Sequence, residues 1–142
     1  MKLNLEFSAS SDCADIRIEI YLNNKKIFES TAQQQLQQVL CNIDEDPADH
    51  ELTLIMSGKN RNHTVVNHAG EITSDVYFTI DQLEFEELDM REVFCLGKEC
   101  YTHSFNSDRP EFLDEFYGII GCNGTVKINF STPIYLWLLD YM

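Results

Sequence analysis

The sequence predicts an all-β fold: an antiparallel β-sandwich of jelly-roll type with an apolar C-terminal extension. Apolar residues alternate with polar ones in most of the apolar stretches, which is the period of a strand with one buried face. Asn, Gly, Asp and Pro separate these stretches at short intervals, so seven to nine strands are expected. The chain has 142 residues, 44% of them hydrophobic and 11% aromatic, which is enough for the core of one domain.

The first half of the chain contains the clearest strands. "LNLEF" (3–7) and "DIRIEIYL" (15–22) both alternate with a period of two residues. The pair Asn23-Asn24 then predicts a tight hairpin into "KKIFES", because asparagine tolerates the positive φ angles that such turns require. "HELTLIMSG" (50–58) predicts a further strand of the same kind.

The glutamine-rich segment "STAQQQLQQVLCNI" (30–43) is compatible with two structures. Leu36, Val39 and Leu40 suit a short helix, whereas the position of the segment between two strands favours a strand with a polar face. We expect the strand. A loop should follow around Pro47, since proline lacks the backbone donor that a strand interior needs.

In the stretch from residue 76 to 88, the alternation of apolar and polar residues shifts by one position. Its apolar residues fall into two sets of opposite parity, Val76, Phe78 and Ile80 in one and Leu83, Phe85 and Leu88 in the other. One extra residue at Asp81-Gln82, a β-bulge, would direct both sets into the same core.

We expect a single domain over residues 1–142, with a sandwich core over about residues 1–90 and an extension over about 91–142 that packs on it. Within the extension, Asp108 and Pro110 predict a short helix, because aspartate caps helices and proline suits their first turn. "TVKINF" (125–130) predicts another strand.

The C-terminal "TPIYLWLLDYM" is densely apolar. Such an end either packs back over the sandwich or presents an anchor to a partner subunit. Packing is favoured. The residues that would dock to a partner are Tyr135, Leu136, Trp137, Leu138 and Leu139.

Charge and cysteine usage limit the partners. The net charge of −14 argues against a nucleic-acid partner, because a phosphate backbone requires a basic surface. The N-terminus lacks the apolar segment of a signal peptide, and no apolar run approaches the roughly 20 residues of a membrane span. The five cysteines form no CxxC pair, so buried thiols are expected; Cys95 and Cys100 would close a small loop only outside a reducing compartment.

We expect no catalytic activity. The sequence contains no GxSxG, Walker, GxGxxG or HExxH motif. His63 and His68 are five residues apart, but a zinc site needs further ligands and no cysteine or aspartate stands at a recognisable spacing. Exposed loop histidines are therefore favoured.

Calcium is a better match to the loop before residue 76, because its ligands are oxygens. Asp75 stands at the head of a strand and follows a polar loop. The alternative is that Asp75 is an ordinary residue at the end of a strand.

Three segments together resemble calcium-dependent, xylan-binding-type carbohydrate-binding modules. They are "IRIEIYLNNKKIFES", "HELTLIMSGKN" and "SDVYFTIDQLEFEELD", and the resemblance covers about residues 3–90. It implies Ca²⁺ held by Asp75, with Asn60 and Asn62 as companions, and a polysaccharide ligand. Tyr77 and His63 are the candidate ligand contacts. The sequence departs from such modules in its sugar platform, because its single tryptophan lies in the C-terminal run.

The ending "GCNGTVKINFSTPIYLWLLDYM" (121–142) is similar to that of small virion-associated proteins of tailed bacteriophages, notably those of marine cyanobacteria. This resemblance implies a non-enzymatic structural or adhesion module of the virion, made in the host cytoplasm. Its partners would be other virion proteins, copies of itself and host-surface glycans. The alternative is a purely structural decoration, tail or baseplate protein that docks through its C-terminal segment and binds no sugar.

Overall fold

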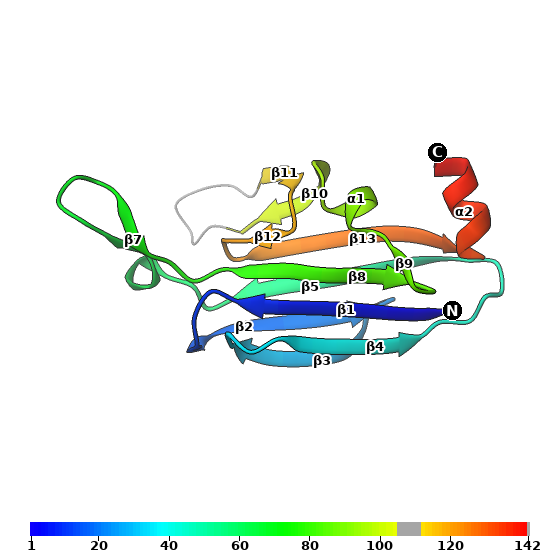
Figure 1. Cartoon of the computed structure of the whole chain (residues 1–142), viewed down its shortest axis with the longest axis horizontal. Coiled ribbons are helices and arrows are strands. Elements are labelled where there is room, and N and C mark those ends of the chain that lie inside the picture. Colours follow the sequence, from blue (N-terminus) through cyan, green and yellow to red (C-terminus); the bar gives the residue numbers. More distant parts are fainter. Residues whose placement is uncertain (105–111, 142) are drawn as a thin grey trace.

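The computed structural model describes residues 1–104 and 112–141 (Figure 1). In chain order, its elements are β1 (Lys2–Ala9), β2 (Cys13–Leu22), β3 (Lys25–Ala32), β4 (Gln37–Asn42), β5 (Ala48–Ser57), η1 (Arg61–His63), β6 (Val65–Val66), β7 (Ile72–Ser74), β8 (Phe78–Phe85), β9 (Leu88–Asp89), α1 (Arg91–Phe94), β10 (Lys98–His103), β11 (Phe112–Phe116), β12 (Ile119–Ile120), β13 (Gly124–Thr132) and α2 (Ile134–Tyr141).

Two antiparallel sheets form a sandwich, which confirms the predicted all-β fold. One sheet has the strand order β12–β8–β1–β4, with β9 paired to β8, and the other has the order β11–β10–β13–β5–β2–β3. The hairpin of β6 and β7 projects from one end of the sandwich, whereas α2 and the N-terminus lie at the opposite end (Figure 1).

The core lies between the sheets and is built from alternate residues of their strands. Aromatic rings connect the two sheets: Phe85 lies 4.6 Å from Phe130, and Phe7 lies 5.7 Å from Phe28, measured between ring centroids. The strand faces expected from the alternation are buried in β1, β2, β5 and β13. Burial of each large apolar side chain stabilises the folded state by about 1.5–3 kcal/mol relative to an exposed side chain.

The predicted bulge is confirmed at Asp81. Glu6 pairs with Gln82 and Phe7 pairs with Ile80, so Asp81 has no opposite residue on β1. Its carboxylate accepts a hydrogen bond of 2.9 Å from the Ser8 hydroxyl. The phase change therefore has the predicted cause, although the last apolar residue of the stretch lies outside the core in the exposed strand β9.

Two other local predictions are confirmed. Asn23 and Asn24 have φ angles of 51° and 67° and form the hairpin between β2 and β3. The glutamine-rich segment forms β4, with Val39 buried and Leu40 exposed. The polar face of this strand explains why its pattern is also compatible with a helix.

The segment after residue 90 supplies strands of the six-stranded sheet. β13 lies between β5 and β10, and β11 forms one edge of that sheet. The helix expected from Pro110 is wrong over Phe112–Phe116, which is β11; Asp108 and Pro110 themselves lie outside the described residues. Pairing with β10 outweighs the local capping signals, and Phe116 is buried as a result.

The C-terminal segment forms α2, and one face of this helix contacts the sandwich. Ile134 is fully buried, Leu138 is half-buried, and the ring of Trp137 stacks on Phe94 with centroids 5.6 Å apart. Among the described residues, no helix is long and apolar enough to cross a membrane. All five cysteines are free thiols, and Cys95 and Cys100 are buried.

Candidate functional site

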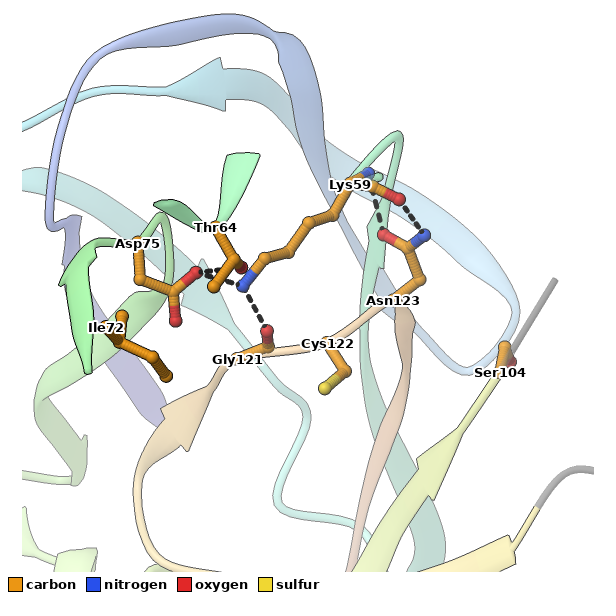
Figure 2. A pocket seen from close by; sticks show the side chains of 8 residues that line it. All are labelled: Lys59, Thr64, Ile72, Asp75, Ser104, Gly121, Cys122 and Asn123. Atoms are coloured by element: carbon orange, nitrogen blue, oxygen red, sulfur yellow. Dashed lines mark hydrogen bonds and ion pairs between the residues drawn. The ribbon is translucent and has the colours of Figure 1, made fainter. Parts of the chain in front are cut away.

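A pocket of about 300 Å³ lies at the end of the sandwich from which the β6–β7 hairpin projects (Figure 2). The loop after β5, the hairpin and the turn before β13 meet there, because β5 and β13 are neighbours in the sheet. The pocket is lined by Lys59, Thr64, Ile72, Asp75, Ser104, Gly121, Cys122 and Asn123.

The main chain of Lys59 is held by the side-chain amide of Asn123. The N–H of Lys59 donates to Oδ1 of Asn123 (2.9 Å), and Nδ2 of Asn123 donates to the Lys59 carbonyl (2.8 Å). These two hydrogen bonds fix the main chain of Lys59 at the point where its side chain enters the pocket.

The ammonium of Lys59 is fixed by two acceptors. Nζ lies 2.6 Å from Oδ1 of Asp75 and donates to the Gly121 carbonyl at 2.6 Å, as Figure 2 shows. The side chain of this lysine is only 10% exposed. A long cationic side chain is therefore immobilised at both ends.

Asp75 accepts further hydrogen bonds at the same oxygen, from the Thr64 hydroxyl (2.8 Å) and the N–H of Val76 (2.9 Å). Partial burial raises the pKa of Asp75, but the hydrogen bonds from Lys59 and Thr64 and the charge of Lys59 together hold it below its ordinary value. Asp75 is therefore ionised and paired at neutral pH.

The residues that the structure describes around Asp75 do not fit a calcium ion. Calcium takes six to eight oxygen ligands, usually with several carboxylates. Among the residues that the structure describes, Asp75 is the one carboxylate that lines the pocket, and the ammonium of Lys59 already lies against it. The ammonium of Lys59 supplies the positive charge that the resemblance to calcium-dependent modules attributes to a metal ion at Asp75.

The other predicted calcium ligands do not line this pocket. Asn60 and Asn62 are exposed, and Oδ1 of Asn60 accepts the N–H of Asn62 at 2.9 Å within their own loop. Tyr77 is half-buried and also lies outside the pocket lining.

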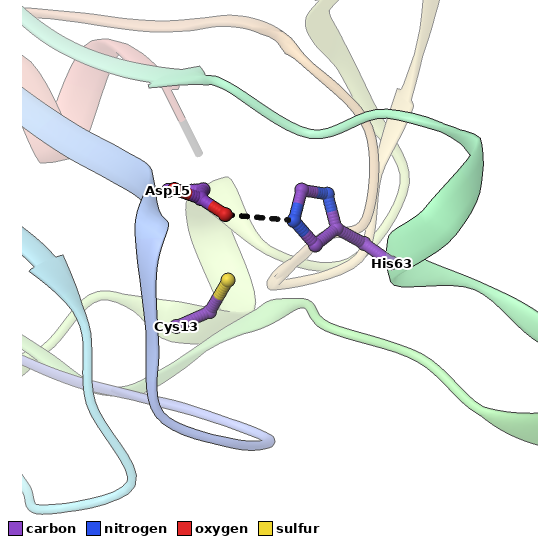
Figure 3. A group of neighbouring side chains, drawn as sticks. All are labelled: Cys13, Asp15 and His63. Atoms are coloured by element: carbon purple, nitrogen blue, oxygen red, sulfur yellow. Dashed lines mark ion pairs between the residues drawn. The ribbon is translucent and has the colours of Figure 1, made fainter.

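His63 belongs to the same loop, but it contacts the start of β2 and is not among the residues that line the pocket. Its Nε2 is 3.8 Å from Oδ2 of Asp15, and Cys13 lies beside them (Figure 3). His68 is exposed at the turn between β6 and β7. The structure thus groups His63 with a cysteine and an aspartate from the start of β2.

Sequence reasoning missed Lys59, Gly121 and Asn123. Asn123 directly precedes β13, and its amide meets Lys59 only through the pairing of β5 with β13. A contact between residues 64 positions apart has no local signal in the sequence.

No family model matches the chain, and no curated protein matches it. Among solved structures, it is similar to vCBM60 in complex with galactobiose, with a TM-score of 0.52 and 8% identity over 89% of this chain and 96% of that chain. The chain shares the fold of this carbohydrate-binding module. At this level of identity the likeness concerns the fold alone.

The second similar structure is the SeMet form of vCBM60, described with a circular permutation that links two families of calcium-dependent carbohydrate binding modules. Its TM-score is 0.49 at 6% identity, over 89% of this chain and 87% of that chain.

Proposed function

We propose that the protein is a non-catalytic module that binds neutral glycans in the pocket of Lys59 and Asp75. The fold it shares with vCBM60, a carbohydrate-binding module seen with galactobiose, supports this proposal. The observation that carries it is the fixed Lys59 ammonium, with two of its three donors used by Asp75 and Gly121. The described residues place no third acceptor on this ammonium, so its remaining donor can reach a sugar hydroxyl.

The rest of the pocket suits a sugar. Thr64 and Ser104 contribute hydroxyl groups to the lining, and Ile72 supplies an apolar wall. A few fixed polar groups beside an apolar surface are typical of small-ligand sites. The net charge of −14 disfavours acidic polysaccharides through long-range repulsion, which is why a neutral glycan is the better ligand.

The experiment is calorimetric titration with galactobiose as the first probe, followed by other neutral oligosaccharides. Lys59→Met removes the ammonium and keeps most of the apolar side chain, and Lys127→Met, on the exposed face of β13, is the matched control. A hydrogen bond from a charged group contributes about 1.5–3 kcal/mol, so Lys59→Met should weaken binding about tenfold or more. Equal affinity of Lys59→Met and Lys127→Met would refute the assignment.

We further propose that the module belongs to a bacteriophage virion and contacts glycans of the host surface. The resemblance of residues 121–142 to virion-associated phage proteins supports this location. Mass spectrometry of purified particles of the phage that encodes the chain is the test. Absence of the protein from the particles would contradict the virion assignment. It would not bear on the proposal that the pocket binds a glycan.

A structural docking function is the second candidate, and the outer face of α2 favours it. Tyr135, Leu136 and Leu139 are between 57% and 72% exposed, whereas Trp137 and Leu138 of the predicted docking set face the sandwich. Replacing Leu136 and Leu139 by serine should leave the fold intact. If this face joins copies of the chain, light scattering will show the oligomer dissociating; an unchanged mass would exclude that form of docking.

A further inference from the structure

We propose that Cys13, Asp15 and His63 form a binding site for a divalent transition metal, with Zn²⁺ as the best match. The site joins the start of β2 to the loop after β5. It lies outside the glycan pocket, and the proposal does not depend on glycan binding.

An irregularity in β2 places two of the ligands. Cys13 pairs with Ala32 and Arg17 pairs with Thr31, so three residues of β2 between these pairs have no partner on β3. Ile16 is fully buried and anchors this segment. Residues two apart in an extended chain share a face, which places the side chains of Cys13 and Asp15 on the same side.

The loop after β5 is held against this irregularity. Gly58, with a φ of +90°, lies so close to the Asp15 carbonyl that a Cβ atom at this position would overlap its oxygen. His63 follows five residues later in η1, and its side chain is 12% exposed. The close approach of the two backbones therefore brings a loop histidine to the strand start.

The three ligand atoms converge on one space, as Figure 3 shows. The Cys13 sulfur, an Asp15 oxygen and a His63 nitrogen all lie within 4.8 Å of one another. Zinc at about 2.0–2.3 Å from each atom of a tetrahedral set requires separations of about 3.3–3.8 Å. Adjustments of about 1 Å suffice, and Asp15 is 83% exposed and free to make them.

The chemistry of the donors selects the metal. Thiolate, imidazole and carboxylate are the three ligand types of zinc, whereas calcium takes oxygens. One thiolate and one carboxylate balance the charge of a divalent ion. Three protein ligands leave a fourth position for water or an exogenous ligand, and the exposure of Asp15 opens that position to solvent.

Metal binding requires a local change at Asn60. The N–H of Asn60 donates to Nδ1 of His63 at 2.9 Å and directs Nε2 toward Asp15. Coordination through Nε2 places the imidazole proton on Nδ1, so this amide must release its bond, while the Cys13 thiol releases its proton to solvent. The amide resonance of Asn60 should therefore shift when metal binds.

The test is titration of the full chain, freed of metal by chelator, with Zn²⁺ by calorimetry and with Co²⁺ by absorbance. We expect one equivalent of either metal and a thiolate-to-cobalt charge-transfer band. Loss of partners outside the ligand shell alone costs about 10- to 100-fold in metal affinity, so Cys13→Ser and His63→Gln should each exceed tenfold. The charge-transfer band should vanish in Cys13→Ser.

Matched controls are Cys41→Ser, a half-buried thiol of β4, and His68→Gln at the hairpin turn. Both should bind like the wild type. Absence of stoichiometric binding by the wild type, or equal losses in the controls, would overturn the proposal.

A measurement on the wild type alone keeps the test valid if a variant does not fold. Zn²⁺ should slow alkylation of Cys13 and leave that of Cys41 unchanged. Cys95 does not interfere, because burial raises the pKa of its thiol to about 11. Equal alkylation of Cys13 with and without Zn²⁺ would contradict the site.

Discussion

Asp75 and Lys59 show how neighbouring groups decide the role of a single residue. The sequence predicted that Asp75 lies beside a polar loop, and the structure places it there. It also places Lys59 against the same carboxylate, in a pair that is partly shielded from solvent. The sequence does not predict that Lys59 lies beside Asp75. The direction of the Lys59 side chain depends on the two hydrogen bonds between its main chain and the Asn123 amide.

The ion pair predicts a pH dependence of stability. The pKa of Asp75 is lower in the folded protein than its ordinary value of 3.8, so the stabilisation is present above that value. It is lost as the pH falls through the folded pKa. The free energy of unfolding of the wild type should exceed that of Asp75→Asn at pH 7, and the gap should narrow toward about pH 3.

Urea denaturation at both pH values measures this gap. Asp44→Asn, in the exposed loop between β4 and β5, controls for the general loss of acidic charge. If the difference in the free energy of unfolding between wild type and Asp75→Asn stays constant with pH, the ionised form of Asp75 does not stabilise the folded protein.

At the scale of elements, two strand irregularities differ in how well the sequence reveals them. The bulge at Asp81 was predictable because apolar residues on both sides of it have opposite parity. The irregularity at the start of β2 was not predictable. The residues before Ile16 are polar or small, so they show no alternation of apolar and polar positions that could reveal a shift. The grouping of Cys13 and Asp15 with His63 was hidden for the same reason.

The close approach of Gly58 to β2 gives a prediction with an internal control. Gly58→Ala adds a Cβ at a positive φ and against the Asp15 carbonyl, whereas Gly70→Ala has a similar φ of +82° and open space around it. A non-glycine residue in such a conformation costs about 1–2 kcal/mol. Gly58→Ala should destabilise the protein by at least about 1 kcal/mol more than Gly70→Ala, because the backbones must also move apart.

Chemical denaturation of both variants tests this difference. Equal free energies of unfolding would mean that the loop accommodates a side chain at Gly58, and that the contact does not hold the loop in place.

At the scale of the whole molecule, the last third of the chain completes the sandwich. β13 was predicted as a strand, but its position between β5 and β10 was not, since the order of strands depends on long-range pairing. The same pairing creates the pocket, whose lining comes from residues 59–75, Ser104 and residues 121–123. The strands were therefore largely predictable, and the site was predictable only at Asp75.

Truncation separates the two faces of α2. Deleting residues 134–142 removes the fully buried Ile134 and the stacked Trp137, and should cost more than about 3 kcal/mol of stability. Deleting only residues 139–142, which include the exposed Leu139, should change stability little. Urea denaturation followed by circular dichroism compares the two; similar losses would show that the outer end of the helix also supports the core.

The central claim is that a glycan binds beside a cation that the protein itself provides. Titration of the wild type with galactobiose, once with calcium and once with EGTA, tests it most directly. Because Lys59 occupies the position next to Asp75, the two affinities should be equal, and both should fall in Lys59→Met. Binding that requires calcium and disappears in EGTA would contradict the account.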